Sequence, residues 1–277
     1  MRPLLLVHGI GSNARETFGT PGRVFSRSLP GSMFEFLVRS GYVPRHDLFW
    51  FNYHTFRPIP ESAGFLRSEI VKVLDVTGSE SLDIITFSLG GIVAKYYSVS
   101  SIYQGEIGRL IMIAPPFLGS PWANWFQFQF APSQKDQLFP GDGRALSPQV
   151  LRMGNPFLVQ LADTPFPEAI ETTVIALKAL LSMDRRSLAA GYARWLNGWV
   201  GEGDLVVPVA STRVAADYYF EVLDDFSLRA VHKQLPFHPE IQALIKKQLE
   251  LVPQHGETSL ETGNDAVSGS ARLGDLR

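Results

Sequence analysis

Ser88 stands where the sequence could present a serine as a nucleophile. The segment Leu82–Gly91 reads as a buried strand, a tight turn and then a helix. A nucleophile elbow has that order, and its strained turn projects the serine hydroxyl above the edge of a sheet. Small residues are required where strand and helix approach: Gly90 and Gly91 meet this need, whereas Thr86 stands where glycine is usual. The alternative role for Ser88 is a cap on the following helix.

A serine hydroxyl is a weak nucleophile until a base removes its proton, and that base is usually a histidine. Three histidines follow Ser88 in the chain. His232 lies between the last predicted strand and the last predicted helix, where the base is expected, and is the favoured candidate. His238, directly before the proline that opens the last helix, is the alternative. His255 lies in a polar tail, which disfavours it.

The carboxylate that orients the base is expected between the serine and the histidine in the chain. Asp204 lies in a glycine-containing turn ahead of an apolar run, within Gly203–Pro208. Backbone N–H groups of such a turn can keep a carboxylate ionised. Asp204 is therefore the first candidate, and Glu202 is the second. Asp224 and Asp225, which follow another apolar run, are the third choice.

A second strand-and-glycine segment could stabilise the negative charge of an acyl-transfer intermediate. The apolar run at residues 4–7 leads into His8–Gly11, where the glycines allow the backbone to turn its N–H groups inward. Two N–H donors aimed at the oxyanion can each contribute ~3–4 kcal/mol. The expected donors are Ile10 and Leu89, and His8 is expected to be structural. The alternative is a phosphate-binding turn, but no phosphate-loop pattern is present.

The segments that carry these residues alternate between strand-like and helix-like patterns. Apolar runs without alternation indicate strands buried on both faces, hence a mostly parallel sheet with helices on both sides. The predicted strands are Leu4–Val7, Leu48–Tyr53, Leu82–Thr86, Leu110–Ala114, Thr173–Leu177 and Tyr218–Leu223. The predicted helices are Ser32–Ser40, Glu61–Asp75, Gly90–Ser101 and Pro239–Leu251. This alternation predicts a doubly wound domain of the α/β class.

Residues 121–199 interrupt the alternation and are predicted to be an insertion that contains one strand of the sheet. We interpret the insertion as a cap or lid over an apolar pocket; the alternative is one more layer of core. Its last part, Lys178–Trp199, has helical spacing of apolar residues. Its first part is aromatic: Trp122, Trp125 and Phe126 are assigned to substrate binding, and Phe128 and Phe130 follow them. Residues 1–120 and 200–252 are the predicted core, and 253–277 a disordered polar tail.

The composition narrows the class of protein. The chain has no cysteine, which excludes disulfides, thiolate catalysis and cysteine-ligated zinc. A net charge of −2 gives no basic surplus for binding nucleic acid or an anionic membrane. The N-terminal apolar run is too short for an export signal, and no stretch reaches the length of a membrane span. We therefore expect a cytoplasmic protein whose partner is a small ester or lipid, with its oligomeric state open.

Together these segments resemble the lipase and esterase branch of the α/β-hydrolase superfamily. The resemblance is carried by Leu6–Gly11, Phe87–Gly91, Gly203–Pro208, His232 and the run Ile113–Pro121, in that family's order. It covers roughly residues 3–120 and 200–250. It implies the α/β-hydrolase fold with a cap or lid insertion. The departures are Thr86 for glycine, Phe87 where histidine is frequent, and Pro116-Phe117 for proline-histidine.

The resemblance also implies a reaction. It makes Ser88, Asp204 and His232 a catalytic triad that cleaves carboxylic esters through an acyl-enzyme, with Ile10 and Leu89 as oxyanion donors. It implies no metal and no cofactor. Two alternatives remain open on the same scaffold: acyl transfer to an alcohol by the same triad, and a non-catalytic protein that binds a lipid or a protein partner.

Overall fold

Six parallel strands form one sheet, in the order β2-β1-β3-β4-β5-β6. The computed structural model describes residues 2–21, 29–126, 147–180, 198–225 and 231–250. The strands are β1 (Leu4–Val7), β2 (Leu48–Phe51), β3 (Leu82–Phe87), β4 (Ile107–Ile113), β5 (Glu171–Leu180) and β6 (Tyr218–Asp225). Each contains one of the six runs that the sequence predicted as strands, or most of it, so the predicted parallel α/β sheet is confirmed.

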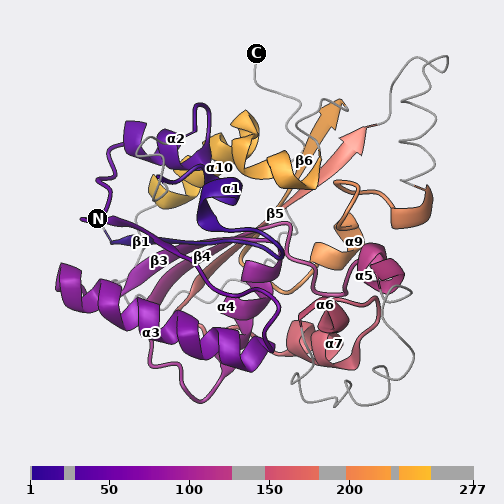
Figure 1. Cartoon of the computed structure of the whole chain (residues 1–277), viewed down its shortest axis with the longest axis horizontal. Coiled ribbons are helices and arrows are strands. Elements are labelled where there is room, and N and C mark those ends of the chain that lie inside the picture. The colour runs from indigo at the N-terminus through magenta and orange to yellow at the C-terminus, as the bar shows by residue number, and fades with distance from the viewer. Residues whose placement is uncertain (1, 22–28, 127–146, 181–197, 226–230, 251–277) are drawn as a thin grey trace, which may run out of the picture.

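Helices cover both faces of the sheet, which is why its strands are apolar throughout. On one face pack α3 (Ile59–Thr77) and α4 (Leu89–Val99), and on the other α1 (Ala14–Phe18), α2 (Met33–Arg39) and α10 (Pro239–Glu250) (Figure 1). Successive strand residues point to opposite faces. In β1, accordingly, Leu5 and Val7 join the core beneath α3 and α4, while Leu4 and Leu6 join the core beneath α1, α2 and α10.

The strand order reverses direction at β1, and this creates the place for a site. From β1 the chain first adds β2 on one side and then crosses over to add β3 on the other. Loops that leave the carboxyl ends of two such strands diverge, and ligands of open α/β sheets bind in the crevice between them. The loop after β1 and the turn after β3 leave the sheet side by side, since Val7 pairs with Thr86. They carry Ile10 and Ser88.

The insertion contributes a central strand and several short helices. β5 lies between β4 and β6, as expected for the strand predicted at Thr173–Leu177. The helices α5 (Pro121–Phe126), α6 (Ser147–Val150) and α7 (Pro156–Asp163), with α9 (Val209–Thr212) from beyond the insertion, gather near the carboxyl ends of the strands (Figure 1). They lie beside the crevice rather than behind the sheet, which supports a role in bounding a pocket.

The helix predicted for Lys178–Trp199 is wrong at its start. Residues 178–180 continue β5 and pair with residues 223–225 of β6. These residues are strand because they pair with β6, a long neighbouring strand that extends the hydrogen-bonded ladder beyond the end of the apolar run. Residues 181–197 of that prediction, Phe128 and Phe130, and the tail 253–277 lie outside the described residues.

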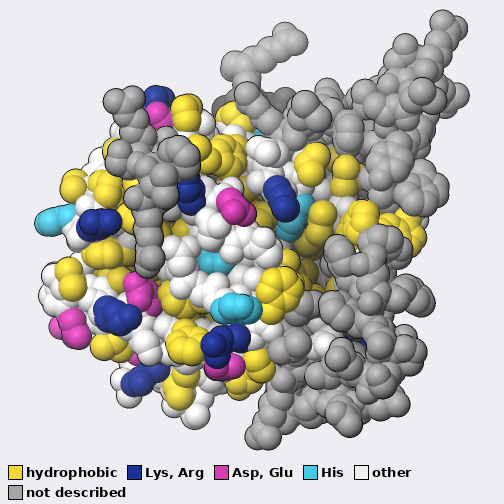
Figure 2. Space-filling model, viewed as in Figure 1, with side chains coloured by type: hydrophobic (Ala, Val, Ile, Leu, Met, Phe, Trp, Pro, Cys, Tyr) yellow, Lys and Arg dark blue, Asp and Glu magenta, His cyan; other side chains and the backbone are white. Residues whose placement is uncertain are grey.

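Within the described part of the chain, no helix is long and apolar enough to cross a membrane. On the face that Figure 2 presents, lysine and arginine side chains are interspersed with aspartate and glutamate side chains. That face therefore carries no large field of one sign among its described residues, in keeping with the small net charge of the whole chain.

Lys95, in α4, is a buried cation that faces the segment after α7. Its side chain is fully buried, its Nζ donates to the Thr164 carbonyl at 2.5 Å, and it lies 3.4 Å from the centre of the Phe166 ring. Loss of hydration on burial lowers the pKa of Lys95 to about 8. The ammonium form is thus less favourable in the folded protein than in the unfolded chain.

We expect the stability of the protein to rise with pH because of Lys95. Between about pH 8 and pH 10 the unfolded chain binds this proton and the folded chain releases it, so the free energy of unfolding increases by about 1.4 kcal/mol per pH unit. Lys95→Met removes that dependence. Urea unfolding at pH 7.5, 8.5 and 9.5 should show that the free energy of unfolding of the wild type increases relative to that of the variant at the two higher pH values. A difference that stays constant across the three pH values would contradict the account.

Candidate active site

Ser88 occupies a strained turn between β3 and α4. Its φ of 53° and ψ of −123° place a non-glycine residue at positive φ, a conformation that surrounding structure must enforce. The enforcing contact is close packing of backbones: a Cβ on Gly90 would lie 2.6 Å from the Val7 carbonyl oxygen. The Ser88 side chain makes no capping hydrogen bond to the helix. The alternative role as a helix cap is therefore wrong.

Thr86 fits this turn although glycine is usual there. Its side chain is fully buried, and its hydroxyl lies 3.5 Å from the Ile111 carbonyl oxygen, which accepts a hydrogen bond from it. Room for the threonine comes from Gly91, since a Cβ there would lie only 3.3 Å from the Thr86 hydroxyl. The departure from the usual pattern leaves the turn intact.

His232 and Asp204 form a continuous hydrogen-bonded chain with Ser88. The Nε2 atom of His232 lies 3.0 Å from the Ser88 hydroxyl, and its Nδ1 lies 2.6 Å from Oδ2 of Asp204. A carboxylate only accepts, so Nδ1 carries the proton and Nε2 accepts the hydroxyl proton. All three side chains are buried. The structure thus brings together the three residues that the sequence singled out, from segments 28 and 144 positions apart.

The carboxylate of Asp204 is held by its own loop. Its Oδ1 accepts hydrogen bonds from the backbone N–H groups of Val206 at 3.0 Å and Val207 at 2.8 Å. The backbone N–H of His232 donates to the Asp204 carbonyl at 3.1 Å, which also fixes the histidine's own backbone. Both oxygens of the carboxylate are therefore engaged, one toward the loop and one toward the imidazole.

The other candidate acids and bases whose side chains are described do not contact Ser88, His232 or Asp204 but form ion pairs elsewhere. Glu202 is exposed and forms an ion pair with Lys178 at 2.6 Å. His238 pairs with Asp224, with Nε2 3.2 Å from Oδ2. Asp225 is the last described residue of β6, but its side chain and His255 lie outside the described residues. Of the alternatives, His238 and Asp224 do meet each other, but in a pair of their own.

The loop after β1 touches Ser88 directly. A Cβ added to Gly9 would lie 3.0 Å from the Cβ of Ser88, so the loop passes over the serine with no room for a side chain. Leu89 is the first residue of α4, and N–H groups in the first turn of a helix have no partner within it. Among the described residues, the N–H groups of Ile10 and Leu89 donate no backbone hydrogen bond outside helices and strands. Both are free to bind a ligand.

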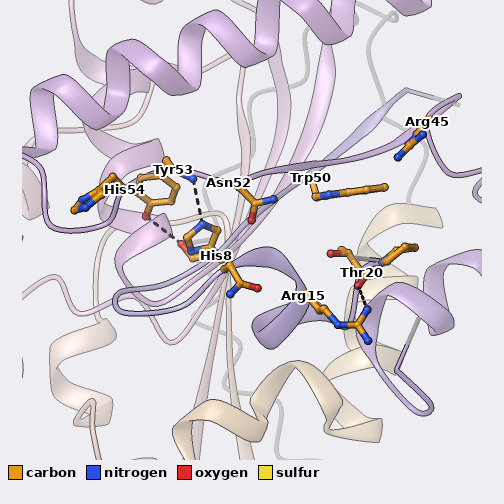
Figure 3. Close-up of a pocket in the computed structure, with 10 residues that line it drawn as sticks. His8, Arg15, Thr20, Arg45, Trp50, Asn52, Tyr53 and His54 are labelled. Atoms are coloured by element: carbon orange, nitrogen blue, oxygen red, sulfur yellow. Dashed lines mark hydrogen bonds between the residues drawn. The ribbon is translucent and has the colours of Figure 1, made fainter. Parts of the chain in front are cut away.

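The loop is supported from behind by the segment after β2. His8 is buried, and burial lowers the pKa of its imidazole, so the ring is neutral at pH 7. Its Nε2 accepts from the N–H of Tyr53 at 3.3 Å, and its own carbonyl accepts from the Tyr53 hydroxyl at 3.0 Å (Figure 3). Its Nδ1–H donates to the Gly9 carbonyl at 3.0 Å. His8 is therefore structural, as expected.

Two more hydrogen bonds complete this support. The Gly11 N–H donates to the Thr55 hydroxyl, and the Ala14 N–H donates to the side-chain oxygen of Asn52, each at 2.9 Å. Neither contact is predictable from a local pattern, because both join residues about forty positions apart through side chains that are ordinary in loops. They fix the path of the loop that presents Ile10 to Ser88.

A cavity of about 400 Å³ opens over Ser88 and His232. One side is apolar and the other, formed by the loop after β1 and α1, is polar. The apolar lining comprises Pro116, Trp122, Ala123, Leu151, Val206 and Val207, and the polar lining Ser12, Glu16 and Thr17; Ile10, Phe87, Ser120 and Lys233 complete it. Its size and largely apolar wall are typical of small-molecule sites.

The sequence predicted part of this lining. Trp122, which was predicted to bind substrate, lies in the cavity wall. Trp125 and Phe126 belong to α5, but their side chains lie outside the described residues. Phe87, noted only as a departure from a motif, packs its ring 4.6 Å from the His232 ring and so limits the positions that the imidazole can take. Leu151 was not predictable, because a single leucine in a weakly patterned segment carries no signal.

A second hollow, of about 670 Å³, is lined by residues that follow β1 and by residues in and around β2. It is more open and is bounded by His8, Arg15, Arg45, Trp50 and neighbouring residues, which Figure 3 shows arranged around it. Among its described lining residues are none of the three that form the hydrogen-bonded chain. We therefore place the candidate active site in the smaller cavity, which contains Ser88 and His232.

Comparison with solved structures identifies the fold. The chain superimposes on Bacillus licheniformis lipase BlEst2 in its mature form with a TM-score of 0.64 and 17% identity, over 90% of this chain and 91% of that one. It also superimposes on a metagenomic carboxyl esterase (TM-score 0.59, 14% identity, 90% and 76% covered) and on phospholipase PlaB from Legionella pneumophila (TM-score 0.59, 14% identity, 90% and 59% covered). No protein-family model and no curated protein sequence matches the chain.

These neighbours share the parallel sheet and surrounding helices described above, at identities that speak for the fold alone. The sequence resemblance to the lipase and esterase branch and the structural likeness agree. The chain therefore has the α/β-hydrolase fold, in a form similar to that of bacterial lipases and esterases.

Proposed function

We propose that the protein is a serine hydrolase that cleaves carboxylic esters through an acyl-enzyme. The observation that carries this proposal is the chain of hydrogen bonds from Asp204 through His232 to Ser88, at 2.6 and 3.0 Å, on the floor of a largely apolar cavity. A nucleophile, a base within hydrogen-bond reach and a group that orients the base are what acyl transfer by serine requires.

In the proposed reaction, Ser88 Oγ attacks the ester carbonyl carbon while Nε2 of His232 takes the hydroxyl proton. The carbonyl oxygen becomes an oxyanion, for which the free N–H groups of Ile10 and Leu89 are the candidate donors. His232 then protonates the leaving alcohol, and the acyl group remains on Ser88. Water, deprotonated by the same imidazole, releases the acid. Asp204 keeps the proton on Nδ1 and stabilises the imidazolium.

The two sides of the cavity suit the two halves of an ester. The apolar side, between Trp122 and Leu151, fits an acyl chain, because burying each methylene contributes about 0.8 kcal/mol. The polar side, near Ser12 and Glu16, fits the alcohol. Residues 121–199 supply Trp122, Ala123 and Leu151 to the apolar side, which supports our proposal that the insertion bounds the acyl pocket.

Hydrolysis of p-nitrophenyl esters from acetate to palmitate tests this function and sizes the pocket. We expect kcat/KM to rise from acetate to a maximum at a medium chain and to fall for palmitate, since a cavity of about 400 Å³ holds only part of a long chain. Product analysis with added alcohol separates hydrolysis from acyl transfer. A rate that is highest for acetate and declines with every added methylene would contradict the proposed acyl pocket.

A further inference from the structure

Two side chains from the segment around residue 121 donate hydrogen bonds to backbone carbonyls of the loop that carries Asp204. The indole Nε1–H of Trp122 donates to the Leu205 carbonyl at 2.8 Å. The hydroxyl of Ser120 donates to the Val206 carbonyl at 2.6 Å. Trp122 is the second residue of α5 and Ser120 directly precedes that helix, so both donors lie more than eighty residues away in the chain.

These two carbonyls belong to the peptide units that hold the carboxylate. The Leu205–Val206 unit accepts the indole N–H at its carbonyl and donates its N–H to Oδ1 of Asp204; the Val206–Val207 unit accepts the serine hydroxyl and donates its N–H to the same oxygen. A peptide unit is planar and rigid, so fixing its carbonyl also fixes the direction of its N–H. Hydrogen bonds in series through a peptide also polarise one another.

The loop needs outside support because its backbone is strained. Leu205 has a φ of 70°, a left-handed conformation that is unfavourable for a residue with a branched side chain. The donors are anchored in turn. The Ser120 N–H donates to the Leu151 carbonyl at 2.8 Å, and the Ser211 hydroxyl donates to the Gly119 carbonyl at 2.5 Å. The support therefore comes from a segment that is itself hydrogen-bonded to two other parts of the chain.

We propose that Trp122 and Ser120 are positioning residues for Asp204, acting through these two peptide units. The proposal rests on the proposed function, in which Asp204 orients His232. It adds a link between substrate and acid: Trp122, Ser120 and Val206 also line the cavity, so an acyl chain packs against the residues that set the carboxylate. Acyl binding then favours the loop conformation in which the carboxylate meets the imidazole.

The first test is kinetic. Trp122→Phe keeps a large aromatic ring but removes the N–H, and Ser120→Ala removes the hydroxyl. We expect each to lower kcat for a short ester roughly tenfold with KM little changed, and to move the acidic limb of the kcat/KM profile to lower pH, because a loosened carboxylate stabilises the imidazolium less. Ser120→Thr keeps a hydroxyl and should restore most of the rate.

The matched control is Trp199→Phe. The Trp199 ring packs perpendicular to the Trp122 ring at 5.0 Å, so this variant disturbs the same aromatic pair while leaving the Trp122 N–H in place. It should leave the pH profile unchanged. Equal effects of Trp199→Phe and Trp122→Phe on kcat and pH profile would overturn the positioning role.

A second readout does not depend on turnover. The proton in the 2.6 Å hydrogen bond between His232 and Asp204 should give a far-downfield proton NMR signal, assigned by its absence in His232→Ala. We expect the signal to move upfield and to exchange faster with water in Trp122→Phe and Ser120→Ala, but not in Trp199→Phe. An unchanged signal in both variants overturns the proposal. A protein that hydrolyses no ester but shows these shifts would instead refute the proposed function and keep the positioning role.

Discussion

Ser88→Ala should abolish ester hydrolysis without unfolding the protein. We expect kcat to fall by at least about 10⁴-fold, because the variant keeps the cavity and the oxyanion donors but loses the atom that forms the acyl-enzyme. The free energy of unfolding should stay within about 1 kcal/mol of the wild type, since among the described residues the Ser88 hydroxyl makes a single hydrogen bond, to His232. Initial rates with a p-nitrophenyl ester and urea unfolding measure the two quantities.

Alanine substitutions at His232 and His238 provide a matched comparison for that result. His232→Ala should lower kcat about as much as Ser88→Ala, and the double variant should be no worse than either, because the two residues act as a unit. His238 is also buried and also pairs with an acid, Asp224. His238→Ala should retain activity within about threefold at 25 °C. Loss of activity in His238→Ala but not in His232→Ala would mean that His238, and not His232, is the base.

Gly90→Ala should damage both the fold and the site. The added Cβ would lie 2.6 Å from the Val7 carbonyl oxygen and 2.9 Å from that of His8, and backbone cannot move aside as a side chain can. We expect the free energy of unfolding to decrease by about 1–3 kcal/mol, which corresponds to a fall in Tm of roughly 3–10 °C. Because the displaced strand end carries Gly9 and Ile10, kcat should also fall, by up to about 10²-fold.

Gly64→Ala is the control for that substitution. Gly64 is also helical, in α3, and a Cβ there has no neighbour within 4 Å. Alanine favours a helix over glycine, so this variant should gain about 0.5–1 kcal/mol and keep full activity. Thermal unfolding of the two variants should give a lower Tm for Gly90→Ala than for Gly64→Ala. Equal Tm values would mean that the approach of α4 to β1 is looser than the structure describes.

The elements of the sheet were predictable because burial on both faces makes each strand a continuous apolar run. The run at Leu82–Thr86 and the run at Leu110–Ala114 carry that signal within themselves. The end of β5 carries no such signal, since residues 178–180 are strand only because β6 extends beside them. Pairing with a distant segment is a tertiary effect that a local pattern does not contain.

The candidate site divides in the same way. Ser88, Asp204 and His232 were predictable because each stands in a local pattern, namely a strand–turn–helix, a glycine turn and a loop before the last helix. The residues that support them were not. Trp122 was noted for its ring, whereas its N–H bonds the Asp204 loop 83 positions away. Tyr53 fixes His8 from 45 positions away and carries no local mark of that role.

Labelling with a fluorophosphonate, followed by mass spectrometry of the peptide that contains Ser88, shows directly whether Ser88 is an activated nucleophile. The reagent forms a covalent bond only with a serine that a neighbouring base activates, and it requires no knowledge of the natural ester. We predict stoichiometric labelling of the wild type at Ser88, none in Ser88→Ala and greatly slowed labelling in His232→Ala. A wild type that stays unlabelled at Ser88 would contradict the account and indicate a binding protein built on a hydrolase scaffold.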